Sequence, residues 1–336
     1  MHKDWNHYLR ADCLNWLLEK NNPSVRFLTL TQLLEKKKTH PEVIQSRNNI
    51  MESGVVPKIL AKQKKGGYWE EPENFYIRTK YNGTVWQFII LSELGADKQD
   101  SRIIDTCEFI LDYSQDRQSG GFSYRGTGET GGYHSGVIPC LTGNMTWSLV
   151  RFGYLDDPRV KEAIQWIITY LRFDDGIEQE LHGWPYDRFE QCWGQHTCFL
   201  AVVKSLKSLA EIPSNKRSPA VKDTIEKAAE FILAHHLYKR SHNLSKVAKS
   251  KWLKLGFPWM WDTDVLEMLG ILLKLGYKDE RMQEGMDLVL SKQDESGRWL
   301  LEQTYAGRYK VNIEQKNKPS KWITLNALRA LKEYNK

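Results

Sequence analysis

Apolar residues recur along the chain with the three- and four-residue spacing of an α-helix. Four segments carry apolar residues on one face only: 103–111, 160–171, 225–233 and 282–290. Segments that are apolar nearly all round precede three of them: 85–91, 198–203 and 265–273. A one-faced helix covers a core, whereas a helix that is apolar all round is buried. The alternation predicts an all-α protein in which an outer layer of helices wraps an inner layer.

A loop motif repeats between these segments. It consists of a glutamine, a short polar gap, a glycine and an aromatic ring, and it occurs at 63–69, 115–122 and 293–299. Glycines followed by an Asp and an Arg also recur, at Gly95, Gly153 and Gly276. The first two are 58 residues apart, and the last two are 123 apart, close to two such periods. This period is about the length of a helical hairpin, so we expect the glutamine–glycine loops to be corners of a repeating unit.

The repeat predicts an α/α toroid, which is a closed ring of about five to six helical hairpins. Inner helices are expected to begin near residues 83, 144, 194, 263 and 322. Residues 52–336 would form the toroid domain, and residues 1–51 an N-terminal helical segment that packs on the ring. Closure would bring the last helix, at 323–334, against the first. An open superhelix of stacked hairpins is the alternative topology.

Composition narrows the setting in which the protein works. The chain has 336 residues and a formal net charge of +6, with basic residues scattered over many segments, which does not predict a nucleic-acid-binding surface. No apolar run approaches about 18 residues, and the first residues lack the apolar stretch of a secretory signal. Five cysteines fit a reducing compartment better than a disulfide framework. We therefore expect a cytoplasmic protein without a transmembrane segment and without a nucleic-acid partner.

The glutamine–glycine–aromatic corners, on hairpins of this length, resemble the repeat of the prenyltransferase and squalene-oxidase family. That family includes terpenoid cyclases and the β subunits of protein prenyltransferases. The resemblance covers residues 52–334 and implies an α/α toroid with an aromatic-lined cavity inside the inner ring. It further implies a terpenoid cyclase- or prenyltransferase-like protein that binds an isoprenoid or an isoprenoid diphosphate there. The Asp-x-Asp-Asp motif of cyclases is matched at Asp262 and Asp264, with Val265 in place of the last acid.

Parallel inner helices would place their N-termini at one end of the ring, where free N–H groups and positive partial charge can hold an anion. We expect ligand-binding residues at these helix starts: Tyr81, Trp86, Asn144, Trp147, Trp193, Trp261, Lys321 and Trp322. The recurring tryptophans predict an aromatic collar around a cavity mouth, where rings can stabilise a carbocation or stack on sugars. Core packing is the alternative explanation for each ring singly.

Three residues are candidates for catalysis, namely Asp262, Asp264 and His134. When two carboxyl groups lie close together, repulsion between their charges raises the pKa of one of them. That group can then act as a general acid and protonate an alkene or a glycosidic oxygen. Capping of a helix N-terminus is the alternative role for at least one of the two aspartates. His134 lies in a glycine-rich segment that is long enough to form a rim or lid.

Residues 192–198 and Cys140 form a candidate zinc site. Cys192 and His196 are four residues apart and share one face of a helix. Cys198 and Cys140 could supply further thiolates, and three cysteines with a histidine are a zinc complement. Reduced cysteines are also among the most buried residue types, so packing in the core is the alternative. Zinc is the one cofactor that the sequence suggests.

Three classes of function remain open. The first is an isoprenoid enzyme, a cyclase or prenyltransferase. The second is a carbohydrate-active enzyme, because helical toroids also host paired-carboxylate hydrolases and lyases. The third is a non-catalytic binding module on the same fold. Each of them takes a small molecule as partner, apolar or isoprenoid in the first class.

Overall fold

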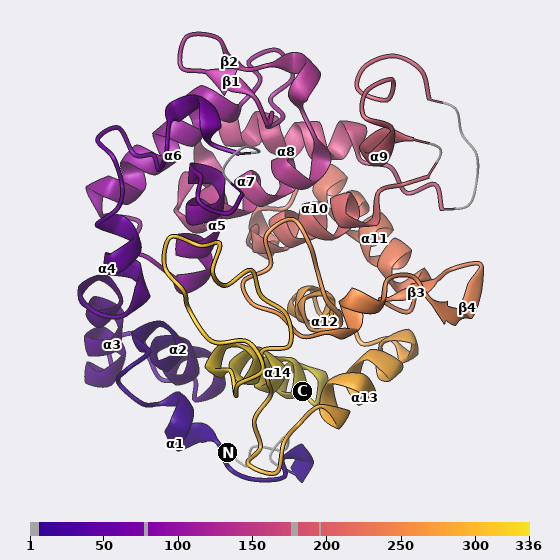
Figure 1. The fold of residues 1–336 in the computed structure, drawn as a ribbon. Helices are drawn as coiled ribbons and strands as arrows, with labels where there is room; N and C mark the ends of the chain where they lie inside the picture. The colour runs from indigo at the N-terminus through magenta and orange to yellow at the C-terminus, as the bar shows by residue number, and fades with distance from the viewer. Residues whose placement is uncertain (1–6, 77–79, 176–180, 195) are drawn as a thin grey trace.

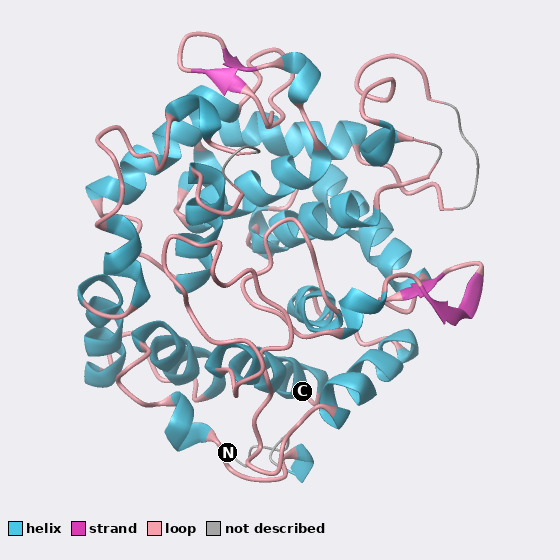
Figure 2. Ribbon diagram, viewed as in Figure 1, coloured by secondary structure: helices cyan, strands magenta, loops and turns pink. Residues whose placement is uncertain are grey.

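The protein is a ring of helices in two layers (Figures 1 and 2). The computed structural model describes residues 7–76, 80–175, 181–194 and 196–336. The inner helices are α5 (Thr84–Leu94), α7 (Pro139–Arg151), α10 (Phe199–Glu211), α12 (Val265–Lys274) and α14 (Lys321–Tyr334). The outer helices that follow the first four are α6 (Ser101–Ser114), α8 (Pro158–Tyr170), α11 (Pro219–Ala234) and α13 (Gln283–Ser291). The all-α toroid expected from the sequence is confirmed.

The remaining elements are short. Near the N-terminus lie α1 (Leu14–Leu17), α2 (Pro23–Leu28), α3 (Pro41–Glu52) and α4 (Val55–Leu60), and a π-helical turn at Thr29–Leu33 continues α2. Helix α9 (Glu190–Trp193) stands alone in a long connection. Two antiparallel hairpins project from the ring, β1 (Gly126–Thr127) with β2 (Gly131–Gly132), and β3 (Lys239–Arg240) with β4 (Asn243–Val247). No helix in the described part of the chain has the length and apolar character needed to span a bilayer.

The inner helices begin at residues 84, 139, 199, 265 and 321, close to the expected positions. Helix α7 begins earlier than expected because Pro139 occupies its first turn, where its fixed φ and missing N–H cost nothing. Helix α10 begins later, because α9 ends at Trp193 and residues 196–198 are not helical. Almost every side chain of α5 is buried, whereas α6 buries one face, as the hydrophobic pattern predicts.

The repeated loops are corners that tie each hairpin to the next one. The Gln63 amide donates to the Arg102 carbonyl oxygen at 2.8 Å, and the Gln115 amide donates to the Arg159 carbonyl oxygen at 2.6 Å. The aromatic residue of each corner donates its backbone N–H to a threonine in the first turn or turns of the next inner helix. These pairs are Trp69 with Thr84, Phe122 with Thr142 and Trp299 with Thr324, at 3.1, 2.9 and 3.1 Å. Each corner therefore fixes the next inner helix and, in the first two, the next outer helix.

The corner glycines allow the backbones to approach closely. Gly67 and Gly120 have φ of +83° and +81°, and a Cβ at either position would lie within 3 Å of the backbone of α6 or α8. Gly297 has φ of +72°, but here the backbone within reach is that of Ala11, at 2.1 Å from the added Cβ. The N-terminal segment thus takes the place of the next outer helix at the third corner.

The N-terminal segment and the last helix contact each other and close the ring. Helix α14 lies beside α2 (Figure 1), and the Lys332 ammonium donates to the carbonyl oxygens of Gln32 and Leu33 at 2.7 and 3.1 Å. The Lys321 ammonium donates to Glu19 at 2.8 Å. The last helix therefore packs on the first, and the open superhelix is not the topology of this chain. The proposed domain division, 1–51 and 52–336, stays a prediction.

The corner glycines give a graded test of the fold by alanine substitution. In Gly67→Ala the alanine must adopt a left-handed backbone conformation, and its Cβ would lie 2.3 Å from the Asp105 carbonyl group. Gly276→Ala adds only the backbone strain, since φ is +89° and no atom lies within 4 Å of the added Cβ. Gly270→Ala adds neither the strain nor a close contact. We expect Gly270→Ala to preserve or raise the free energy of unfolding, Gly276→Ala to lower it by about 1–2 kcal/mol, and Gly67→Ala to lower it further.

Urea unfolding of the three variants measures this order. If Gly67→Ala and Gly276→Ala lower the free energy of unfolding equally, the backbone at Gly67 does not approach α6 closely.

Candidate functional site

A pocket of about 630 Å³ lies inside the ring. Its walls come mainly from the C-terminal halves of the inner helices, from Glu93 on α5 to Arg329 on α14. Aromatic residues of the connection before α12, Phe257 and Trp259, line it together with Trp147 of α7. The volume is in the range typical of small-molecule sites, and the wall combines aromatic rings with charged side chains.

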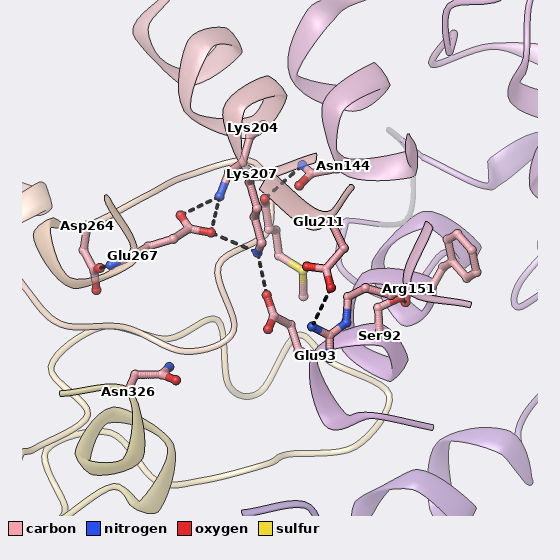
Figure 3. A network of polar contacts seen from close by, with 12 residues as sticks. Ser92, Glu93, Asn144, Arg151, Lys204, Lys207, Glu211, Asp264, Glu267 and Asn326 are labelled. Atoms are coloured by element: carbon pink, nitrogen blue, oxygen red, sulfur yellow. Dashed lines mark hydrogen bonds and ion pairs between the residues drawn. The ribbon is translucent and has the colours of Figure 1, made fainter. Parts of the chain in front are cut away.

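A buried ion network runs along this wall (Figure 3). The Lys204 ammonium, which is fully buried, contacts both carboxylate oxygens of Glu267 at 2.9 and 2.7 Å. The Lys207 ammonium bridges Glu267 at 3.0 Å and Glu93 at 2.6 Å. It also lies 4.0 Å from the centre of the Trp147 ring. The network therefore joins α5, α10 and α12 through charge-assisted hydrogen bonds.

The network fixes the charge states of its members. Burial acts to raise the pKa of Glu267, but the two lysine ammonium groups outweigh it and hold that pKa below its ordinary value. Burial lowers the pKa of Lys204, with Glu267 acting against this effect. Burial acts in the same direction on Lys207, yet Glu93 and Glu267 together raise its pKa. Glu267 is thus held as a carboxylate at neutral pH.

A second group of charges lies nearer the C-terminal ends of the helices. The Lys274 ammonium contacts Glu211 at 2.5 Å, and an Arg151 nitrogen lies 3.8 Å from the same carboxylate. The Arg151 guanidinium also lies over the Trp147 ring, 5.2 Å from its centre. Burial acts to raise the pKa of Glu211, but Arg151 and Lys274 lower it overall. These contacts neutralise most of the cationic wall.

Asp264 stands apart from these pairs. It lines the pocket, is almost fully buried, and accepts the backbone N–H groups of Glu267 at 2.7 Å and Gly256 at 2.8 Å. Burial raises its pKa to about 7, because the two N–H groups only partly offset the loss of water and the Glu267 carboxylate adds repulsion. Asp264 is therefore both the N-cap of α12 and a carboxyl group that can carry a proton near neutral pH.

The other two candidates for catalysis lie in different surroundings. Asp262 is buried and accepts a hydrogen bond from Lys251 at 2.6 Å. The Nδ1 atom of His134 lies 2.7 Å from an Asp116 oxygen, and the imidazole stacks on the Trp184 ring at 4.0 Å. Neither Asp262 nor His134 is among the pocket-lining residues, so only Asp264 of the three faces the pocket. Their catalytic roles stay predictions.

Of the residues expected to bind a ligand, Trp147 lines the pocket. Most of the other rings are buried against neighbouring rings: Trp86 stacks on Tyr76 at 5.0 Å, and Trp322 on Phe257 at 4.3 Å. The Trp261 indole donates to the Tyr81 hydroxyl at 3.3 Å. Trp193 is buried, Asn144 donates to the Met260 carbonyl oxygen, and Lys321 pairs with Glu19. A ligand-binding role for these residues stays a prediction.

The zinc hypothesis finds no support in the structure. Residues 7–76, 80–175, 181–194 and 196–336 contain no group of three or more His, Cys, Asp or Glu side chains placed to hold a metal ion. Burial raises the pKa of Cys192 to about 12 and raises that of Cys140 as well, with neighbouring thiols adding to the effect. His196 is exposed, and Cys198 is half-buried.

The charged wall is the part of the site that the hydrophobic pattern did not indicate. Lys207 and Glu211 are four residues apart on α10, as are Trp147 and Arg151 on α7. On α14, Asn326, Arg329 and Glu333 follow the same helical spacing. Charged residues at helical spacing within otherwise buried helices were the available signal, since such groups are rarely buried without partners.

No known protein family matches the chain, and no curated protein matches its sequence. Solved structures give distant matches. A protein from Actinoplanes has a TM-score of 0.44 at 13% identity, covering 94% of this chain and 90% of its own. The type II terpene cyclase MstE from Scytonema has a TM-score of 0.32 at 13% identity, covering 86% and 96%. A variant of that cyclase in complex with geranylgeranyl dihydroxybenzoate has a TM-score of 0.31 at 12% identity, covering 87% and 96%.

The raised pKa of Asp264 makes the stability of the protein depend on pH. The pKa is about 3.8 in the unfolded chain and about 7 in the folded protein, so the unfolded state loses this proton first as pH rises. Asp264→Asn keeps a good N-cap but removes the titration. We expect the free energy of unfolding of the wild type, relative to Asp264→Asn, to fall between about pH 4 and pH 7 and to level off above.

Urea unfolding between pH 4.5 and 8.5 measures this difference. Asp279→Asn is the matched control, because its hydrogen bond to Arg281 holds the pKa of that N-cap carboxyl at about 2. The difference for the control should not change between pH 5 and 8. A pH-independent difference for Asp264→Asn would show that Asp264 is ionised throughout.

Proposed function

We propose that the protein is an enzyme of terpenoid-cyclase type, which binds an isoprenoid-bearing small molecule in the central pocket and transfers a proton to it from Asp264. The observation that supports this proposal is the state of the two carboxyl groups at the start of α12. The pKa of Asp264 is raised to about 7, whereas Glu267, three residues later, is held ionised by two lysines. Carboxyl groups with pKa values pushed apart in one pocket are the pattern of an acid and its ionised neighbour.

The aromatic side of the pocket suits the hydrocarbon part of such a substrate. Phe257, Trp259 and Trp147 present ring faces or edges to the pocket. A carbocation formed by protonation of an alkene can be stabilised by ring faces, and the Glu267 carboxylate would add favourable charge. In this scheme Asp264 gives its proton to the alkene carbon and is left as a carboxylate, which accepts a proton again when the product cation loses one.

A carbohydrate-active enzyme is the second candidate, and the charged wall favours it. A proton donor near pH 7 beside an ionised carboxylate also suits the cleavage of a glycosidic bond. Lysine, arginine and glutamate side chains on the wall could hydrogen-bond sugar hydroxyl groups. The two candidates differ in ligand, and a binding experiment separates them.

Tryptophan fluorescence with two ligand classes tests the proposal. Trp147 and Trp259 line the pocket, so geranylgeraniol should change the emission in a saturable way, whereas oligosaccharides should not. Asp264→Asn should bind geranylgeraniol with similar affinity but lose turnover of an isoprenoid substrate by at least about 100-fold, because proton transfer contributes about 10²–10⁴ to rate. Product analysis by mass spectrometry measures turnover.

Trp147→Phe is the control that assigns the signal to the pocket. Saturation by oligosaccharides alone would favour the carbohydrate candidate. Binding of geranylgeraniol without turnover would favour a non-catalytic binding module, and no response to either class would refute both enzyme assignments.

A further inference from the structure

Arg329 is the one cationic side chain of the pocket wall that has no carboxylate partner within ion-pair distance among the described residues. Five cationic residues line the pocket, and four of them have an ion-pair partner among the described residues: Arg151, Lys207, Lys274 and Lys332. The Arg329 guanidinium makes one hydrogen bond within the described chain, from Nη1 to the Asn326 Oδ1 atom at 3.2 Å. Its remaining N–H groups have no described acceptor.

Desolvation disfavours the positive charge of Arg329. Burial lowers the pKa of Arg329, and the nearby Arg151 lowers it further, while Glu93 and Glu211 act against this from beyond ion-pair distance. A partly buried guanidinium without an anion loses hydration and regains little. An anion that enters the pocket would supply the missing partner.

The chemistry of the wall selects the kind of anion. A guanidinium presents two parallel N–H groups, which match the two oxygens of a carboxylate. Asn326 lines the same pocket and accepts a hydrogen bond from Arg329, and its side-chain amide nitrogen can donate to one of those oxygens. A diphosphate needs several free cations, but the other cations of the wall are already neutralised, and Glu93, Glu211 and Glu333 line the pocket near Arg329.

We infer that the ligand of the central pocket carries a single carboxylate, which Arg329 binds in a bidentate way with help from Asn326. The inference rests on the proposed function for the hydrocarbon part of the ligand and adds the chemistry of its head group. The anion of the ligand would then lie at the wall formed by α14. It would not lie at the N-terminal ends of the inner helices, where the helix dipoles favour an anion. The carboxylate would give the Arg329 guanidinium an ion-pair partner at close range, which none of the described carboxylates provides.

Three probes with the same C20 chain test the head group: geranylgeranoic acid, geranylgeraniol and geranylgeranyl diphosphate. We expect the acid to bind the wild type at least about tenfold more tightly than the alcohol, and more tightly than the diphosphate. In Arg329→Met the affinity for the acid should fall to that for the alcohol, whose own affinity should not change. Arg329→Lys keeps the positive charge but cannot donate two parallel N–H groups. Its affinity for the acid should lie between those of the wild type and Arg329→Met.

Lys274→Met is the matched control, because it removes one positive charge from the same wall but a charge that Glu211 already pairs. The preference for the acid should survive in this variant. Equal loss in Lys274→Met and Arg329→Met, equal binding of acid and alcohol, or an Arg329-dependent preference for the diphosphate would each overturn the inference.

Simple anions separate this inference from the proposed function. Benzoate should raise the melting temperature of the wild type but not that of Arg329→Met, and inorganic phosphate should act less strongly. If benzoate behaves in this way while no C20 probe binds, the carboxylate site stands and the isoprenoid assignment falls. If neither benzoate nor the acid depends on Arg329, the carboxylate site is refuted.

Discussion

The contact of Glu267 with Lys204 and Lys207 is the interaction on which the interior of this ring depends. The three side chains come from α10 and α12, and Lys207 extends the contact to Glu93 of α5. Charges this deep in a protein are tolerated only when each has a partner at close range. The network therefore holds three inner helices at distances that satisfy it, and these three helices form part of the pocket wall.

Burial raises the pKa of Asp264, and the Glu267 carboxylate of the same network raises it further. The Asp264 carboxyl group caps α12, three residues before Glu267, and it is surrounded by backbone N–H groups and the buried floor of the pocket instead of a cation. In the described part of the chain, the nearby lysines are engaged by Glu267 and Glu93, and no cationic side chain pairs with Asp264. Pairing of the Glu267 carboxylate thus leaves Asp264 with the raised pKa that the proposed proton transfer requires.

Much of the fold could be predicted from the sequence, because the repeat is local. Each Gln–Gly–aromatic corner contacts the inner helix that follows it, and the first two corners also contact the next outer helix, so that three copies of the motif reveal three corners of one repeat. Closure was harder to predict, since Ala11 meets Gly297 although no corner motif marks residue 11. Helical spacing indicates charged positions on single buried helices, but the pairing of these charges could not be predicted from one helix at a time. Glu93, Lys207 and Glu267 are far apart in the sequence, and only the ring brings their side chains together.

The free energy of unfolding of Glu267→Gln tests most directly whether buried charge pairing holds the inner ring together. This change leaves the size of the side chain almost the same but deprives Lys204 and Lys207 of their shared anion, so we expect a loss of about 3–5 kcal/mol. Lys216→Ala, which breaks the exposed 2.9 Å pair with Asp156, should lose less than about 1 kcal/mol and serves as the control. A Glu267→Gln protein as stable as the control variant would show that the ring stands without its buried ion network.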